Sequence, residues 1–445
     1  MSQALPPGPK SPAIWQLLRY TLSPLPFLES CSRRYGGPFT IHLAGFGRFV
    51  MMTDPEAIKD VFRGDPAVLH SGEGNEFFSV TVGKNSVLVL DREPHARQRR
   101  VLLPPLKGER MRAFFEAMQS ATFEAVRSWP VNEPIRMLEW MKDLTLRVML
   151  QVVLGVKSTE QMTDLAAKVR QMLAFGQNRF AYMAPIFLPL RLLEKLPWLP
   201  YFRQLRALDQ SLFAFIQQSR DAPQGDTVVA DLIAATHDDG RPLSDQEIRD
   251  ALVTLIIAGH DTTSVGLAWA LEQIVPRANV VARIDEELQR VTGGTVPRAD
   301  QLQQLEYLDA VIRESLRVRT AVPFVVRLTK QPFKAGNREY PPGVLLCPCI
   351  HLTHRRPDLY PEPEKFRPER FLERRFAAHE WFPFGGGNRM CLGMAFALYE
   401  MKVVLSTLFA SVRMERPTGA RSNPVRRGIV LTPHDGARMI VNFKK

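Results

Sequence analysis

Cysteine is scarce in this chain, and its few thiols are poorly spaced for a metal site. The cysteines are Cys31, Cys347, Cys349 and Cys391. Three of them lack the matched second pair that structural zinc sites use, so we expect no zinc. Unpaired thiols also fit the reducing cytosol, where disulfides are rare. The cysteine content therefore predicts a cytoplasmic protein.

The N-terminus lacks a long apolar run. It reads MSQALPPGPKSP, which has no apolar core of signal-peptide length and no segment long enough to anchor in a membrane. We therefore expect neither secretion nor a membrane anchor, and the protein is predicted to be soluble.

Linkers and repeats are also missing. The chain has 445 residues, of which 45% are hydrophobic and 23% are charged, so it can bury a substantial core. No Ser/Gly-rich linker, low-complexity tract or internal repeat divides it. We therefore expect one large domain over residues 1–445.

Acidic residues are outnumbered, which leaves a formal net charge of +12. The basic residues are dispersed and no aromatic stacking motif accompanies them, which argues against a nucleic-acid partner. Two short basic stretches are residues 95–100 (HARQRR) and residues 107–110 (KGER). Each is either a docking patch for an acidic protein or an ordinary solvated helix face.

Hydrophobic periodicity predicts a mainly α fold with small β-sheets. A hairpin is expected over residues 39–53, followed by a short helix capped by Asp54 and Pro55. Further helices are expected over residues 94–103, residues 109–156 with brief interruptions, residues 247–274, and from near Leu305. The proline-rich residues 341–391 are expected to be irregular, and strand-like runs at 428–431 and 438–442 end the chain.

The apolar segment 247–274 is long enough to raise the question of a membrane-spanning helix. Its centre reads AGHDTT, residues 258–263, whose polar groups would be costly in hydrocarbon. A long helix through the core of a soluble domain fits better. Asp261 and Thr262 place a carboxylate beside a hydroxyl, which could deliver protons, and the small Ala258 and Gly259 would admit a planar cofactor. The alternative is a polar interruption that bends the helix through side-chain hydrogen bonds to backbone.

The most informative stretch is FGGGNRMCLG, residues 384–393, where a glycine-rich loop runs into an apolar helix. Unpaired N–H groups at a helix N-terminus lower the pKa of a thiol, and Arg389 adds a positive charge two residues from Cys391. The glycines at 385, 386, 387 and 393 would let the backbone approach a flat ligand. The pattern predicts a thiolate ligand, with a structural cysteine in a turn as the alternative.

The spacing of Phe384, Gly387, Arg389, Cys391 and Gly393 resembles the haem-binding loop of the cytochrome P450 superfamily. The resemblance implies the cytochrome P450 fold, with the long helix 247–274 crossing the haem. It implies that Cys391 is the axial ligand of iron in haem b (iron protoporphyrin IX). Phe384, Arg389 and Gly393 would then help to bind this cofactor.

The same resemblance gives roles to the long helix. Ala258 and Gly259 would lie against the haem, and Asp261 with Thr262 would form the oxygen-activating groove. Glu314 and Arg317 lie three residues apart on one helix face, where such pairs usually contribute little. The resemblance implies that Arg370 locks this pair into a structural triad that holds the cysteine loop.

The resemblance also implies a clamp for the haem propionates. His95 and Arg99 lie four residues apart on one helix face, and Arg327 follows Pro323 in a strand-like run. With Arg389 these make four groups for two carboxylates, although exposed arginines are common. His351 and His354 have no acidic partner at metal-site spacing and are not expected to bind a metal.

The implied activity is that of a bacterial haem-thiolate monooxygenase, which inserts one atom of O2 into a C–H bond by hydroxylation or epoxidation. No fused flavin or nicotinamide domain is expected, because no GxGxxG lies between a strand and a helix. Electrons from NAD(P)H would therefore reach a monomeric enzyme through a separate ferredoxin and ferredoxin reductase. The alternatives are a peroxide-driven or isomerising relative and a non-enzymatic haem binder or sensor.

The expected substrate is a hydrophobic small molecule, with fatty-acid-like chains slightly ahead of terpenoids and polyketide-like molecules. The positions implied to line the pocket are mostly apolar and include no charged anchor. They are Phe77, Phe78, Val82, residues 175–187 beginning with Phe175, Ala258, Phe324, Val325, Ile429, Val430 and Leu431.

Overall fold

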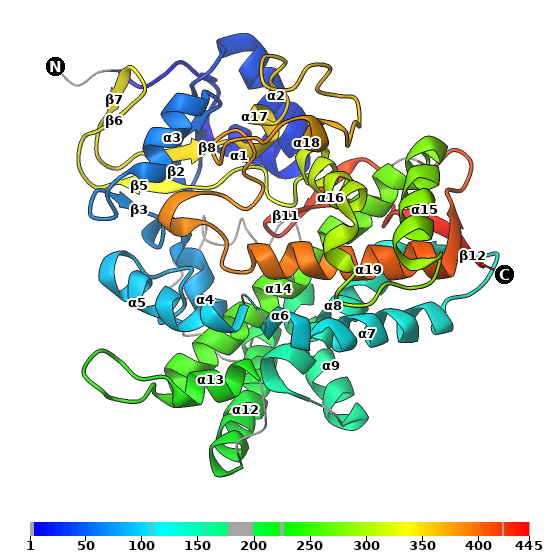
Figure 1. Ribbon diagram of the computed structural model, residues 1–445. Helices are drawn as coiled ribbons and strands as arrows, with labels where there is room; N and C mark the ends of the chain where they lie inside the picture. The colour runs from blue at the N-terminus through cyan, green and yellow to red at the C-terminus, as the bar shows by residue number, and fades with distance from the viewer. Residues whose placement is uncertain are drawn as a thin grey trace.

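The computed structural model describes residues 4–106, 108, 110–156, 158–176, 199–222, 227–420 and 422–444. The strands of its largest sheet gather at one end with α1 (Ala13–Leu22), α2 (Pro24–Tyr35) and α3 (Pro55–Arg63), and long helices fill the rest (Figure 1). The fold is therefore mainly helical with small sheets, as the sequence predicts.

The largest sheet has the strand order β1-β2-β8-β5-β3. β1 (Phe39–Leu43) and β2 (Gly47–Met52) form the antiparallel hairpin that the sequence predicts, and Asp54 caps α3 by accepting from the Ala57 N–H at 3.0 Å. β8 (Leu345–Pro348) runs parallel to β2 and antiparallel to β5 (Arg327–Thr329), which pairs with β3 (Leu69–His70).

Residues 341–391 are more ordered than expected. They contain β8 in the middle of the sheet and the short helices α17 (Ile350–Thr353) and α18 (Arg370–Glu373). All four residues of β8 are buried, so the strand reads as a short apolar run without the alternation that marks a half-buried strand. That is why its periodicity gives no strand signal.

The remaining elements follow one another along the chain. The larger helices are α5 (Arg92–Leu102), α7 (Phe115–Ser128), α8 (Met137–Leu154), α9 (Thr159–Gly176), α12 (Pro200–Asp221), α13 (Val228–Ala234), α14 (Asp245–Ile274), α15 (Ala278–Thr292), α16 (Glu306–Val318) and α19 (Met394–Ser411). Short 3₁₀ and α turns are η1 (Glu73–Phe78), α4 (Ser79–Val82), η2 (Pro104–Leu106), α6 (Arg110–Ala113), η4 (Leu302–Gln304) and η5 (Gly387–Arg389). The minor strands are β4 (Pro134–Arg136), β6 (Phe333–Ala335), β7 (Arg338–Tyr340), β9 (Val412–Glu415), β10 (Pro424–Arg427), β11 (Val430–Pro433) and β12 (Arg438–Phe443).

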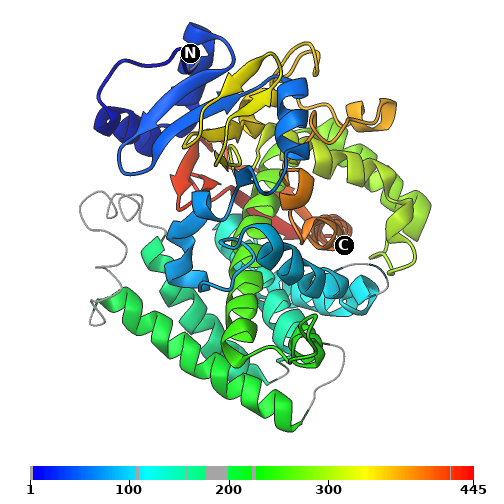
Figure 2. The same ribbon diagram turned by 90° about the vertical axis from the view of Figure 1, so that its left-hand side faces the viewer.

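The predicted long helix is α14, which passes through the middle of the molecule (Figure 2). A capping box fixes its start, because the Ser244 hydroxyl accepts from the Glu247 N–H while the Glu247 carboxylate accepts from the Ser244 N–H. α14 packs against α8, α12, α16 and α19.

Among the described residues, α14 and α19 are the helices long and apolar enough to cross a membrane. The most apolar window of each is largely buried inside the protein, by 72% for α14 and 56% for α19. A position in the protein core accounts for this apolar character.

Candidate active site

Cys391 differs from the other cysteines in keeping exposed surface. Cys391 follows η5 and precedes α19, and its backbone N–H donates to the Phe384 carbonyl at 2.9 Å. Its side chain is exposed, whereas the other cysteines are buried and all four are free. Protein around Cys391 nevertheless raises the pKa of its thiol.

The expected lowering of this pKa is wrong, because burial outweighs the groups that favour the thiolate. Those groups are the backbone N–H of Gly393 and the guanidinium of Arg99. Arg99 reaches the loop from α5, where its Nη1 donates to the Met390 carbonyl at 2.6 Å. The cation beside the thiol is therefore Arg99, which is remote in sequence, and not the neighbouring Arg389.

Arg389 points away from Cys391. Its Nη1 donates to the Val87 carbonyl at 3.2 Å, and its Nη2 bonds the Leu90 carbonyl and the Asp91 carboxylate. The side chain thus spans from the cysteine loop to the segment before α5. Because Arg389 is close to Cys391 in the sequence, it was expected to act on that thiol, but its partner is Asp91.

The glycines of the loop mostly serve protein packing. A Cβ on Gly386 would lie 2.3 Å from the Phe62 ring, and one on Gly387 would lie 2.0 Å from the Phe62 carbonyl oxygen. Both contacts are with α3, so these glycines let the loop approach that helix. Nothing lies within 4 Å of a Cβ on Gly393, which alone of the three leaves open space.

Four basic side chains converge near the loop. Burial lowers the pKa of Arg389 to about 10 and that of Arg327 to about 9, where repulsion by Arg389 adds to the effect. Burial, Arg389 and Arg99 lower the pKa of His95 to about 4, so its imidazole is neutral at pH 7. Arg327 donates to the Ser71 hydroxyl at 2.8 Å and to the Gly386 carbonyl at 3.0 Å. The predicted clamp residues therefore share one place, with an excess of positive charge.

The middle of α14 opens onto free space. The helix is buried over most of its length, but Ala258 is exposed and Asp261 and Thr262 are half-buried. The Thr262 hydroxyl donates to the Ala258 carbonyl at 2.7 Å. Such a side-chain-to-backbone bond is what the alternative interpretation, a polar interruption that bends the helix, predicts. Burial raises the pKa of Asp261, while Lys142 and Arg427 oppose the rise. The acid therefore holds its proton at a higher pH than usual.

Gly259 and His260 face away from this opening. A Cβ on Gly259 would lie 2.7 Å from Sδ of Met149, so the missing side chain lets α14 pack on α8. The expectation that Gly259 makes room for a cofactor is therefore not supported. His260 is buried against the same helix, with its Nδ1 3.0 Å from the Thr145 hydroxyl.

Glu314, Arg317 and Arg370 form the predicted triad and are buried. Arg317 binds both Glu314 oxygens, at 2.6 and 2.8 Å, and Arg370 Nε lies 3.4 Å from Glu314 Oε1. The remaining Arg317 N–H groups donate to the carbonyls of His354, Pro363 and Lys365.

A residue that sequence reasoning set aside joins this triad to the cysteine loop. The carbonyl of His354 accepts from Arg317, while its Nε2 accepts the Phe382 N–H at 3.0 Å, two residues before Phe384. His351 lies 2.8 Å from Glu29 Oε1 instead of at a metal site. In the sequence, His354 stood out only because it lies close to His351, and nothing there showed what it contacts.

The implied pocket residues divide into two groups. Phe77, Phe78, Val325 and Ile429 are half-buried and keep free surface. Val82 and Val430 are 2% and 1% exposed and pack in the main core, so they face no open space. Phe324 packs against Tyr20 and Phe49 on the sheet side. The side chain of Phe175 and residues 177–187 lie outside the described part.

The backbone near the pocket positions is tied together across the chain. The Leu431 N–H donates to the Ala321 carbonyl at 2.8 Å, and the Trp269 indole N–H donates to the Leu431 carbonyl at 2.7 Å. The C-terminal hairpin is thereby held to α14.

In the stretch 95–100, three of the four basic side chains are turned inward or paired, so a docking patch there stays a prediction. His95 is buried, Arg99 turns to the cysteine loop, and the exposed Arg100 pairs with Glu93 at 3.1 Å and Asp238 at 3.3 Å. Lys107, Glu109 and the side chain of Arg110 lie outside the described part, so the second stretch stays a prediction.

The family profile described as Cytochrome P450 matches residues 6–441. The chain belongs to the cytochrome P450 family. It is 35% identical to "Putative cytochrome P450 135B1" of Mycobacterium tuberculosis, over 99% of this chain and 92% of that protein. It is 32% identical to "Putative cytochrome P450 138" of the same species, over 98% and 96%.

The fold is also that of solved P450 structures. "Retinoic acid bound cyanobacterial CYP120A1" superimposes with a TM-score of 0.86 at 23% identity, and the match covers 100% of both chains. As a cytochrome P450, the protein is a haem-thiolate monooxygenase and an oxidoreductase, and its mycobacterial relatives agree with a bacterial origin.

The residues present fit the haem that a P450 binds. Cys391 has exposed surface, Ala258 is exposed in the middle of a mostly buried helix, and buried arginines have lowered pKa values. Anionic propionates would relieve this excess of positive charge. Cys391 would supply the thiolate that holds the haem iron.

Proposed function

We propose that this P450 inserts one atom of O2 into a C–H bond of a hydrophobic small molecule, with Cys391 as the axial ligand of the haem iron. The observation that carries the proposal is the free surface of an otherwise enclosed Cys391 thiol. The bound haem supplies the oxygen activation. The N–H of Gly393 and the Arg99 cation favour the thiolate form that this ligation needs.

The propionates would be held by His95, Arg99, Arg327 and Arg389. The three arginines supply charge, and the neutral His95 supplies a hydrogen-bond donor. Phe384 packs its ring at 6.3 Å from Trp381 and fixes the start of the loop. Glu314, Arg317 and Arg370 would act at a distance, by holding the segment that leads into this loop.

Side chains of α14 would supply the protons that O2 activation requires. Burial raises the pKa of Asp261, so that carboxyl keeps its proton to a higher pH than an exposed aspartate does. Thr262 presents a hydroxyl one residue away, and the bond to the Ala258 carbonyl fixes its direction. Asp261 would hold and pass a proton, and Thr262 would place it at the exposed turn of the helix.

The substrate is an apolar molecule, and fatty-acid-like chains rank ahead of terpenoids and polyketide-like molecules. Phe77, Phe78, Val325 and Ile429 offer free apolar surface. The structural neighbour is described with retinoic acid bound, which is an apolar terpenoid with a ring and a polyene chain ending in a carboxylate. This supports an apolar substrate, and it suits a terpenoid at least as well as a fatty acid.

The electrons would come from NAD(P)H through a ferredoxin and a ferredoxin reductase. The net charge of +12 favours an acidic redox protein as the direct donor. We further propose a monomeric, cytoplasmic enzyme in which residues 1–445 form one haem domain.

The test is spectroscopy followed by turnover. The ferrous–CO complex should show the red-shifted Soret band of thiolate ligation, and fatty acids of graded length should give substrate difference spectra. Turnover should require ferredoxin, reductase and O2. Turnover with peroxide alone would favour the peroxide-driven alternative, and haem binding without turnover of any tested substrate would favour a sensor.

A further inference from the structure

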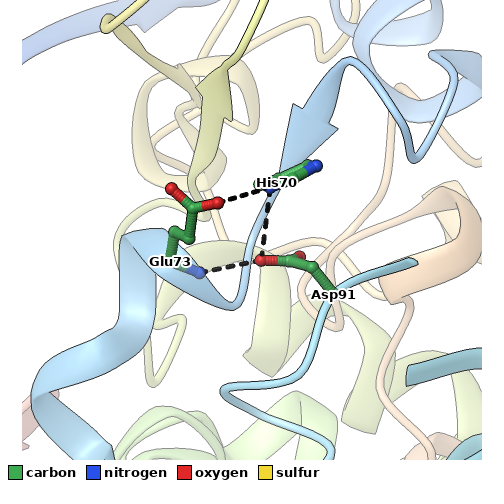
Figure 3. A group of neighbouring side chains, drawn as sticks. All are labelled: His70, Glu73 and Asp91. Atoms are coloured by element: carbon green, nitrogen blue, oxygen red, sulfur yellow. Dashed lines mark hydrogen bonds and ion pairs between the residues drawn. The ribbon is translucent and has the colours of Figure 1, made fainter. Parts of the chain in front are cut away.

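Three side chains lie together where the segment after β3 meets the segment before α5. They are His70, Glu73 and Asp91, whose ligand atoms lie within 4.8 Å of one another (Figure 3). This is not a metal site, because the acids are already engaged. One Glu73 oxygen lies 2.7 Å from His70 Nδ1, and the other accepts from Lys330 Nζ at 2.8 Å.

Asp91 is the inner acid of this group. Its Oδ1 accepts the N–H groups of Ser71 at 2.9 Å and Gly72 at 2.8 Å, and its Oδ2 accepts the N–H of Glu73 at 2.9 Å. The same carboxylate binds Arg389. Asp91 and Arg389 are only 11% and 9% exposed, so their attraction is little screened by solvent.

The turn that Asp91 holds also reaches the second inner arginine. The Ser71 hydroxyl accepts from Arg327 Nη1 at 2.8 Å and donates to the Val326 carbonyl at 2.8 Å. A Cβ on Gly72 would lie 2.3 Å from the Val89 carbonyl oxygen, so only glycine allows this close approach. Residues 71–73 are therefore fixed to Arg327 on one side and, through Asp91, to Arg389 on the other.

The turn continues directly into η1, which ends with the pocket residues Phe77 and Phe78. Among the described residues, Asp91 is the carboxylate whose negative charge raises the pKa of both Arg389 and His95. Asp91 thus bonds the segment that leads to Phe77 and Phe78, binds the arginine of the cysteine loop, and offsets part of the positive charge of the predicted clamp.

We propose that Asp91 is a positioning residue for the haem site, which orients Arg389 and ties the segment 71–78 to it. This inference rests on the proposed function, because it assumes that Arg389 faces a haem propionate. Removing the Asp91 charge leaves the clamp more positive, which favours the ferrous over the ferric haem protein. Loss of the three N–H acceptors also loosens the turn that carries Phe77 and Phe78.

The test compares Asp91→Asn with Glu73→Gln in the haem-loaded protein. Both variants remove one negative charge from the same cluster, but Glu73 is 43% exposed and pairs with Lys330 instead of Arg389. We expect Asp91→Asn to raise the midpoint potential, so that the ferrous-to-ferric ratio at a fixed potential grows threefold or more. Transfer of haem to apomyoglobin should accelerate by a similar factor. Glu73→Gln should remain within twofold of wild type in both measurements.

The inference is overturned if Asp91→Asn and Glu73→Gln give the same potential and the same rate of haem transfer. If Asp91→Asn does not retain haem, Asp91→Glu keeps the charge and displaces the carboxylate by one methylene group. Its haem transfer must then be at least threefold faster than that of Glu73→Gln, and equal rates overturn the proposal. The ferrous–CO band of the wild type tests thiolate ligation independently, so failure of the two ideas can be told apart.

Discussion

Two buried clusters of arginine differ in how their charge is matched. In the scaffold, all five N–H groups of Arg317 have acceptors, including both oxygens of Glu314. Near the cysteine loop, Arg99, Arg327 and Arg389 have lowered pKa values, and the carboxylate that pairs with one of them among the described residues is Asp91, on Arg389. Arginines whose N–H groups are all paired stabilise the fold, whereas arginines whose positive charge is not offset can attract an anionic ligand.

The largest effect is expected at Cys391, whose loop accepts hydrogen bonds from Arg99 and Arg327 and is linked to Arg317 through His354. Cys391→His should abolish the red-shifted Soret band of the ferrous–CO complex, because an imidazole does not donate charge as a thiolate does. Cys31→Ala is the control, since that thiol is buried in a separate core and should leave the band unchanged. A red-shifted band in the Cys391 variant would refute the ligand assignment.

In the matched cluster, Arg317→Ala should prevent stable haem incorporation. The buried Glu314 would lose its bidentate partner, at a cost of about 3–5 kcal/mol. Haem content per protein and soluble yield measure the effect. Arg290→Ala is the control, because Arg290 is 68% exposed and forms only a long pair with Glu287. Normal folding, haem content and turnover in Arg317→Ala would contradict a scaffold role.

In the open turn of α14, Thr262→Ala should uncouple turnover while haem content and substrate affinity stay nearly unchanged. Neither binding step needs the hydroxyl, but the proposed proton delivery does, and assistance of this kind is worth about 10²–10⁴-fold. The ratio of oxygenated product to NAD(P)H consumed measures the coupling. Asp261→Asn should lower the same ratio. If both variants keep the wild-type ratio, the Thr262–Ala258 bond is only a helix distortion.

The smallest effect concerns His260, on the packed side of the same helix. Burial, with Lys142 and Arg170, lowers its pKa to about 3, below the ordinary value of 6.5. The folded state therefore binds fewer protons than the unfolded state between these values, and stability rises with pH up to about 6.5. At pH 5 the cost is on the order of 2 kcal/mol. His260→Asn should narrow the difference in unfolding temperature between pH 5 and pH 7, and an unchanged difference would contradict a neutral buried imidazole.

The sequence predicted features that depend on local pattern. The hairpin 39–53, the cap at Asp54 and the course of α14 follow from alternation, capping residues and apolar length. The convergence of His95, Arg99, Arg327 and Arg389 came from motif resemblance, because these residues lie up to about three hundred positions apart.

Features that depend on what a residue meets in space were not predictable. The partner of Arg389 is Asp91, the cation near Cys391 is Arg99, and the neighbour of Gly259 is Met149. Each is set by the packing of distant elements. Strand β4 was likewise hidden inside a helical expectation, because three residues show no periodicity and their partner lies near the end of the chain.

That pairing of β4 with β12 has a consequence for how the protein is made. Residues 134–136 remain an open edge during translation until residues 438–440 leave the ribosome. Cys391, the proposed ligand, also emerges late, after most of the chain has been synthesised. Residues 134–136 can therefore gain their strand partner only when synthesis has reached residues 438–440.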